Sequence, residues 1–162
     1  MMKKLGYILA TLTVLLIAGC DAGDHDRIPA AAVFVEFKSQ VVWDQYGVTG
    51  SFMHRRFIRN QNEPAGFPYT ISSATGYSGL MLVTNEHATP FVYDLCCPVE
   101  INSNIRIEFD DENLCLRCPR CGSTYDISTG GPMTGPAADG RYFLQSYIIT
   151  PYGTAGGWRI SR

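Results

Sequence analysis

The sequence predicts a small all-β domain, and three observations lead to that expectation. Glycine and proline are frequent, with 16 and 9 residues among 162, as in a chain with many tight turns. Beyond residue 30 the apolar positions show no sustained helical period, while β-branched and aromatic residues are abundant. The segment 105–109 alternates apolar and polar side chains as a half-buried strand does, and residues 110–113 then supply a polar turn.

The remaining elements follow from short apolar runs bounded by turn residues. In chain order, the predicted strands are 33–37, 51–58, 80–84, 91–95, 105–109, 114–117, 124–127, 143–150 and 158–161. The segment 60–77 carries Asn, Pro, Gly and Ser and is expected to be a long loop. Five aromatic residues are expected in the core or at its rim: Trp43, Tyr46, Phe52, Phe57 and Tyr69.

The N-terminus has the pattern of an export signal. Lys3 and Lys4 precede an apolar run over residues 5–16 that is too short to span a bilayer, and small residues then lead to Cys20. This arrangement is similar to the lipobox of bacterial lipoproteins, which implies cleavage after residue 19 and lipidation of Cys20. We therefore expect a signal peptide over 1–19, a flexible tether over 20–30 and one domain over 31–162, on the periplasmic side or the surface of a bacterial envelope.

Cleavage would leave 143 residues, which is enough for one domain. It would also remove two lysines, leaving 11 basic residues against 15 acidic ones and a net charge of −4. A nucleic-acid partner is not expected, because no basic face remains to neutralise phosphates. The membrane, reached through Cys20, is the expected partner, and the sequence identifies no redox partner and no oligomeric state.

Cysteines are the chemistry-bearing residues of this chain. There are six, and apart from Cys20 they fall at Cys96, Cys97, Cys115, Cys118 and Cys121. Five cysteines cannot all pair in disulfides within one chain, although disulfides are the usual state of exported cysteines. A Cys-x-x-Cys pair on a tight turn, as at residues 118–121, can place two thiolates on one metal ion. Together with the cysteine-bearing loop 96–100, the loop 118–126 predicts a buried metal or cluster site.

At these loops the sequence resembles the Rieske-type iron–sulfur proteins. Their pattern is Cys-x-His in one loop and Cys-Pro-x-His-Gly-Ser-x-Tyr/Phe-Asp in the other, followed by a Gly-Pro-Ala loop. Residues 118–126 read Cys-Pro-Arg-Cys-Gly-Ser-Thr-Tyr-Asp, residues 135–137 read Gly-Pro-Ala, and the match extends over about residues 79–161. More narrowly, the chain is similar to Rieske-like lipoproteins of Bacteroidetes-type bacteria. The resemblance implies an antiparallel Rieske-like β-sandwich with a small rubredoxin-like cluster- or metal-binding subdomain.

The resemblance also implies roles for individual residues. Cys97, Cys118 and Cys121 would be metal ligands, and the hydroxyls of Ser123 and Tyr125 would hydrogen-bond to the cluster sulfurs. Both histidine ligands are replaced, because Val99 and Cys121 occupy their positions. A fourth ligand is then needed, and Cys115, Cys96, Glu100 or water could provide it. His25, His54 and His87 lie outside both loops and are expected to be ordinary surface or strand residues.

Three functions remain open at this stage. The first is a [2Fe–2S] centre for electron transfer, with a reduction potential below that of a histidine-ligated cluster. The second is a structural zinc site made of the three cysteines and either Cys115 or Glu100. The third is a metal-free binding module with disulfides. An enzyme is not expected, because Rieske oxygenases need a further domain for a mononuclear iron site and 143 residues leave no room for one.

Overall fold

The computed structural model describes residues 27–162, which form two antiparallel sheets and three short helices. The larger sheet contains β1 (Val33–Phe37), β2 (His54–Phe57), β3 (Ala74–Thr75), β4 (Leu80–Thr84), β5 (Pro90–Asp94), β10 (Ser146–Tyr152) and β11 (Gly157–Ser161). The smaller sheet contains β6 (Glu108–Asp110), β7 (Cys115–Arg117), β8 (Thr124–Tyr125) and β9 (Pro132–Thr134). The helices are α2 (Gln40–Tyr46), the 3₁₀ helix η1 (Arg59–Gln61) and α3 (Pro136–Gly140).

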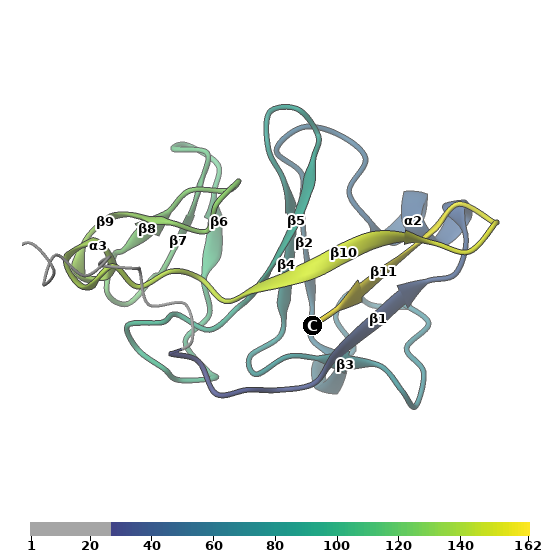
Figure 1. Ribbon diagram of the computed structural model, residues 1–162, viewed down its shortest axis with the longest axis horizontal. Coiled ribbons are helices and arrows are strands. Elements are labelled where there is room, and N and C mark those ends of the chain that lie inside the picture. The colour runs from purple at the N-terminus through teal and green to yellow at the C-terminus, as the bar shows by residue number, and fades with distance from the viewer. Residues whose placement is uncertain (1–26) are drawn as a thin grey trace, which may run out of the picture.

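The smaller sheet is an insertion in the larger one. The strand order is β2-β4-β5-β10-β11-β1-β3 in the larger sheet and β6-β7-β8-β9 in the smaller, so the chain leaves after β5 and returns at β10. In Figure 1 the smaller sheet and α3 lie at one end of the molecule, and β10 runs from there across the larger sheet. The start of β10 pairs with β5 and its remainder pairs with β11, so β10 joins the two halves of the larger sheet. The predicted all-β class is confirmed, as two antiparallel sheets of which the smaller forms a separate subdomain.

Strand β4 separates two hydrophobic cores. All five of its residues are buried, and their side chains alternate between the two sides as the pleat requires. Leu80 and Leu82 pack with the aromatic core under α2, whereas Met81 and Val83 pack with the core that the smaller sheet covers. A strand buried on both faces explains the unbroken apolar run Leu-Met-Leu-Val in the sequence. Cys97 and Cys118 belong to the second core, so the candidate site is built on a rigid base.

Several predicted strands require correction at their ends. The predictions 33–37 and 80–84 coincide with β1 and β4. The predicted strand 51–58 begins only at His54, because Phe52 adopts a positive φ of 53° in a turn. The prediction 105–109 is largely displaced, since β6 starts at Glu108. Its alternation still has a cause: Ile107 is fully buried and its N–H donates to the carbonyl of Leu95 at 2.8 Å.

Helix α2 was not predicted. Its seven residues make about two turns, which is too short for a periodic pattern to stand out. The signal that the sequence did contain is Ser39, whose hydroxyl accepts from the N–H of Val42 as an N-cap. Trp43 is buried, stacks on Trp158 at 4.9 Å between ring centroids, and meets the ring of Phe37 edge-on at 5.0 Å, so its expected place in the core is confirmed.

The segment 60–77, predicted as a plain loop, contains the end of η1 and all of β3. It is fastened to the aromatic core under α2 by Phe67, which is buried against the rings of Phe37, Phe57 and Tyr69. Its other end pairs with β1 through β3.

The predicted signal peptide (1–19), Cys20 and most of the tether (20–30) lie outside the described residues. At the start of the described part, Ile28 is buried and the guanidinium of Arg27 lies 3.7 Å from the ring centroid of Tyr142. Packing against the domain therefore begins before residue 31, the boundary expected from composition. Within residues 27–162 no helix is both long and apolar enough to cross a membrane.

Candidate metal centre

The first cysteine loop is fixed at its start by the buried carboxylate of Asp94. This side chain ends β5 and is fully buried. It accepts four hydrogen bonds, from the N–H groups of Tyr77 (2.7 Å), Ser78 (3.1 Å) and Cys96 (2.9 Å) and from the hydroxyl of Tyr147 (3.0 Å). Burial raises the pKa of Asp94, and these hydrogen bonds offset only part of that rise. No role for Asp94 follows from the sequence, in which the only signal is its place two residues before Cys96.

The second cysteine loop is the connection between β7 and β8. Cys118 follows the end of β7, and Arg117 pairs with Thr124 at the start of β8. The N–H of Cys118 donates to the carbonyl of Ser123 at 2.9 Å, which closes the loop at its base. Cys121 therefore lies at the tip of a hairpin, where its side chain is only partly buried.

Three of the predicted ligands lie together. The sulfur atoms of Cys97, Cys118 and Cys121 are all within 4.8 Å of one another, and the Cys97 and Cys121 sulfurs are 3.7 Å apart. Cys97 and Cys118 are fully buried, whereas Cys121 reaches the surface. The three thiols thus surround one point at the boundary between the second core and solvent. We call them the thiol triad.

The two hydroxyls that the resemblance singled out lie beside the thiol triad. The hydroxyl oxygen of Tyr125 is 3.6 Å from the sulfur of Cys97, and the thiol of Cys121 donates to Oγ of Ser123 at 3.2 Å. Ser123 also accepts from the N–H of Ala137 at 3.0 Å. This bond holds the Gly-Pro-Ala loop against the second cysteine loop.

Gly135 is required for that approach. A Cβ added at Gly135 would lie 3.0 Å from Cα of Ser123, and the φ of Gly135 is +74°. A side chain would therefore push the Gly-Pro-Ala loop away from Ser123.

The thiol triad contains two different electrostatic environments. Burial raises the pKa of Cys118 well above its usual value, and its neighbour Cys97 raises it further. Burial also acts to raise the pKa of Cys121, but hydrogen bonds from Ser123 and from the neighbouring thiols outweigh burial and lower it overall. Burial and the nearby Cys97 raise the pKa of Tyr125, so this hydroxyl stays protonated and can donate to a thiolate.

The three protein side chains predicted as alternatives for a fourth ligand lie elsewhere. Cys96 is buried with its thiol directed at the carbonyl of Cys97, 3.6 Å away. Cys115 is buried in β7 opposite Asp110. The carboxylate of Glu100 lies 3.4 Å from Nε of Arg120 in the second loop. None of them joins the thiol triad within 4.8 Å in the described chain.

The histidines occupy the positions expected for ordinary residues. His54 lies on β2, stacked on Phe109 with ring centroids 4.5 Å apart, and His87 is exposed beside Glu86. His25 is outside the described residues. In residues 27–162 the candidate metal-binding group therefore contains cysteines alone.

Comparisons with known proteins add one likeness. No family model matches the chain, and no curated protein matches it. Among solved structures, the ferredoxin of carbazole 1,9a-dioxygenase from Nocardioides aromaticivorans IC177 is similar at 15% sequence identity with a TM-score of 0.44. The match covers 80% of this chain and 97% of that chain.

The described residues limit what the site can do chemically. Three thiols around one point, one of them partly exposed, can bind a soft or borderline metal ion and leave a further coordination position open. All five described cysteines are free in the structure. Three of them form the thiol triad, which offers a candidate ligand set.

Proposed function

We propose that this chain is a metal-binding protein in which Cys97, Cys118 and Cys121 hold a single thiophilic ion, most simply Zn²⁺. The observation that carries the proposal is the convergence of the three sulfur atoms within 4.8 Å of one another. A zinc–sulfur bond of about 2.3 Å places two sulfurs of a tetrahedral site roughly 3.8 Å apart. The 3.7 Å between the sulfurs of Cys97 and Cys121 agrees with that spacing.

A histidine-ligated Rieske cluster does not fit these residues. Such a cluster has two cysteines on one iron and two histidines on the other, and this chain has Val99 and Cys121 at the histidine positions.

A second function, electron transfer through a [2Fe–2S] centre with cysteine and oxygen ligands, is favoured by one observation. The hydroxyls of Ser123 and Tyr125 contact the sulfurs of Cys121 and Cys97, as hydroxyls that tune a cluster potential would. Under either function the protein is a binding or electron-transfer module and not an enzyme.

The proposal includes a location. The lipobox-like sequence ending at Cys20 supports a lipoprotein held by acyl chains on the periplasmic side or at the surface of a bacterial envelope, of the kind found in Bacteroidetes-type bacteria. Cys20→Ser should release the protein from sedimented membranes. A variant that still sediments after a carbonate wash would contradict acylation at this position.

The metal is tested on the full chain purified in detergent from a bacterial host. We expect one equivalent of zinc by elemental analysis, no acid-labile sulfide and no visible absorbance. A Cys97→Ser, Cys118→Ser, Cys121→Ser triple variant should contain no metal. A Cys96→Ala, Cys115→Ala double variant is the matched control, because both side chains are buried outside the thiol triad.

The other outcomes of this experiment separate the alternatives. A coloured protein that contains iron and acid-labile sulfide would contradict the zinc site and support the [2Fe–2S] centre. A metal-free protein that shows a single free thiol after denaturation without reductant would support two disulfides and overturn metal binding.

A further inference from the structure

The two cysteine loops have the same backbone turn. Residues 97–101 read Cys-Pro-Val-Glu-Ile and residues 118–122 read Cys-Pro-Arg-Cys-Gly. In each loop the N–H of the fifth residue donates to the carbonyl of the first, at 2.9 Å in the first loop and 3.0 Å in the second. The fifth residue has a positive φ in both, 48° at Ile101 and 72° at Gly122. The two loops thus share one backbone turn.

The turn in the first loop places its fifth residue, Ile101, in a backbone conformation that isoleucine disfavours. The left-handed conformation suits Gly122, but Ile101 is β-branched, and an L-residue in this region costs roughly 1–2 kcal/mol. Such a cost persists where the surroundings impose the conformation, and it is frequent at functional sites. Ile101 thus gives the end of the first loop the same left-handed conformation that Gly122 gives the second.

Superposing the turns by position makes each residue of one loop equivalent to a residue of the other. Cys97 corresponds to Cys118, and both are fully buried in the thiol triad. Glu100 corresponds to Cys121, the third member of the thiol triad. The position in the first loop that should supply the fourth ligand is therefore occupied by Glu100, whose carboxylate oxygens are zinc ligands. Val99, one residue earlier, has no donor atom.

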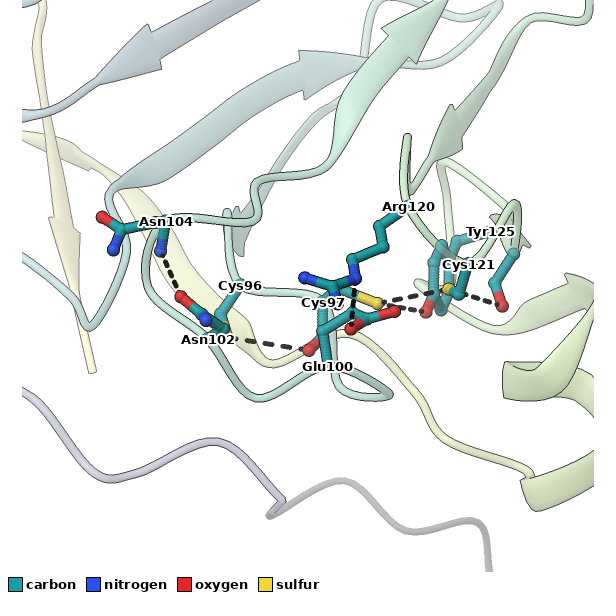
Figure 2. A network of polar contacts seen from close by, with 9 residues as sticks. Cys96, Cys97, Glu100, Asn102, Asn104, Arg120, Cys121 and Tyr125 are labelled. Atoms are coloured by element: carbon teal, nitrogen blue, oxygen red, sulfur yellow. Dashed lines mark hydrogen bonds and ion pairs between the residues drawn. The ribbon is translucent and has the colours of Figure 1, made fainter.

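Glu100 is already held across the second loop. Its Oε2 lies 3.4 Å from Nε of Arg120, the residue directly before Cys121, and its side chain is only 19% exposed. Figure 2 shows Arg120 reaching from the second loop to Glu100 of the first, beside Cys97 and Cys121. The side chain of Arg120 is 67% exposed, so this ion pair is weak and its loss costs little.

The other thiols are less suitable. Cys96 precedes Cys97 and directs its sulfur to the carbonyl of that residue, away from the thiol triad. Cys115 lies on β7, three residues before Cys118, and belongs to neither of the two turns. Only Glu100 shares its place in the turn with a member of the thiol triad.

We propose that Glu100 is the fourth ligand of the centre, so that the paired turns hold one ion by three thiolates and one carboxylate. On binding, the carboxylate of Glu100 exchanges the guanidinium of Arg120 for the metal ion. This assignment rests on the proposed metal-binding function and adds its fourth ligand.

The test is a titration of the metal-free full chain in detergent with Co²⁺, followed by competition with Zn²⁺. Glu100→Gln keeps the size of the side chain and removes the anionic donor. Since losing a partner outside the coordination sphere already lowers metal affinity roughly 10- to 100-fold, Glu100→Gln should weaken Zn²⁺ binding by at least about tenfold. It should also change the visible Co²⁺ spectrum.

Two further variants keep the proposal falsifiable if Glu100→Gln folds poorly. Glu100→Cys copies the second loop and should raise the sulfur-to-cobalt charge-transfer intensity by about one third, from three thiolates to four. Arg120→Gln, the matched control, leaves the donor in place and should bind Zn²⁺ at least as tightly as the wild type.

The outcomes distinguish this proposal from the function on which it rests. If Cys118→Ser abolishes binding while Glu100→Gln and Glu100→Cys retain wild-type affinity and spectra, Glu100 is not a ligand and the metal site survives. If the wild-type chain itself binds neither Co²⁺ nor Zn²⁺, both proposals are overturned.

Discussion

The sulfur of Cys97 lies 3.7 Å from the sulfur of Cys121, although 24 positions separate the two residues in the chain. Cys97 follows the last strand before the insertion, and Cys121 lies within the inserted sheet. A metal ion bound between them would connect the larger sheet to the smaller one. Metal binding should therefore stabilise the contact between the two sheets as well as the loops.

Metal removal should lower the stability of the folded chain. An ion that binds only the folded state adds about 2.7 kcal/mol to the free energy of unfolding when its free concentration is 100 times the Kd. Thermal unfolding with Zn²⁺ and with a chelator should show this difference for the wild type and for Cys115→Ala. Cys118→Ser should show no difference between Zn²⁺ and chelator. A wild-type melting curve that is the same with Zn²⁺ and with the chelator would contradict a metal centre.

Loss of the Ser123 hydroxyl should destabilise the site even without metal. Ser123 is fully buried, and its Oγ accepts from the N–H of Ala137 while it contacts the thiol of Cys121. Ser123→Ala leaves a buried N–H without an acceptor, which costs about 1–3 kcal/mol. Denaturant unfolding of the metal-free protein measures the effect. The exposed Ser146 of β10 provides the control, and equal effects of Ser123→Ala and Ser146→Ala would show that the bond to Ala137 is dispensable.

The sequence predicted the strands best where burial dictates the residues. Strand β4 lies between two cores, so its composition leaves little choice, and its ends were predicted correctly. Helix α2 was missed because its seven residues are held by a cap and by Trp43 rather than by a long pattern. The insertion of the smaller sheet was expected only through the resemblance, because strand pairing between distant segments leaves no mark on local sequence.

The site was predictable as a set of cysteines but not as a geometry. Spacing and resemblance selected Cys97, Cys118 and Cys121. The similarity of the two turns could not be predicted, because an isoleucine with positive φ opposes the local preference of that residue. Glu100 consequently remained one of several alternatives until the backbone of the first loop was known.

The pair of glycines Gly76 and Gly153 offers a matched test of the Asp94 anchor. Both have a positive φ, 72° and 71°, so an alanine at either position has a similar backbone cost of roughly 1–2 kcal/mol. A Cβ at Gly76 would lie 2.5 Å from Oδ2 of Asp94, whereas a Cβ at Gly153 meets nothing within 4 Å. Gly76→Ala must displace a carboxylate that accepts four hydrogen bonds, so it should cost about 1–3 kcal/mol more than Gly153→Ala. If Gly76→Ala and Gly153→Ala lose the same free energy of unfolding in denaturant, the loop at residue 76 can shift without disturbing Asp94.

Stability should fall in mild acid because of His54. Partial burial lowers the pKa of His54 from 6.5, with Arg55 adding to the decrease and Asp111 opposing it. The unfolded chain therefore takes up a proton at higher pH than the folded chain, so the free energy of unfolding decreases as the pH falls through 6.5 towards the lower folded pKa. Above that window the histidine is neutral in both states and its contribution is constant.

This prediction concerns the contact between the sheets, since His54 of β2 stacks on Phe109 of β6. His54→Phe keeps a ring on Phe109 and cannot be protonated, so this variant should lose less stability than the wild type between pH 7.5 and pH 5.5 in denaturant unfolding of metal-free protein. His87→Phe is the control, because the side chain of His87 is 77% exposed and lies outside this contact. If the free energy of unfolding changes with pH equally in the wild type and in His54→Phe, groups other than His54 cause the acid sensitivity. The buried Asp94 cannot be one of them, because its raised pKa makes the folded state relatively more stable as the pH falls.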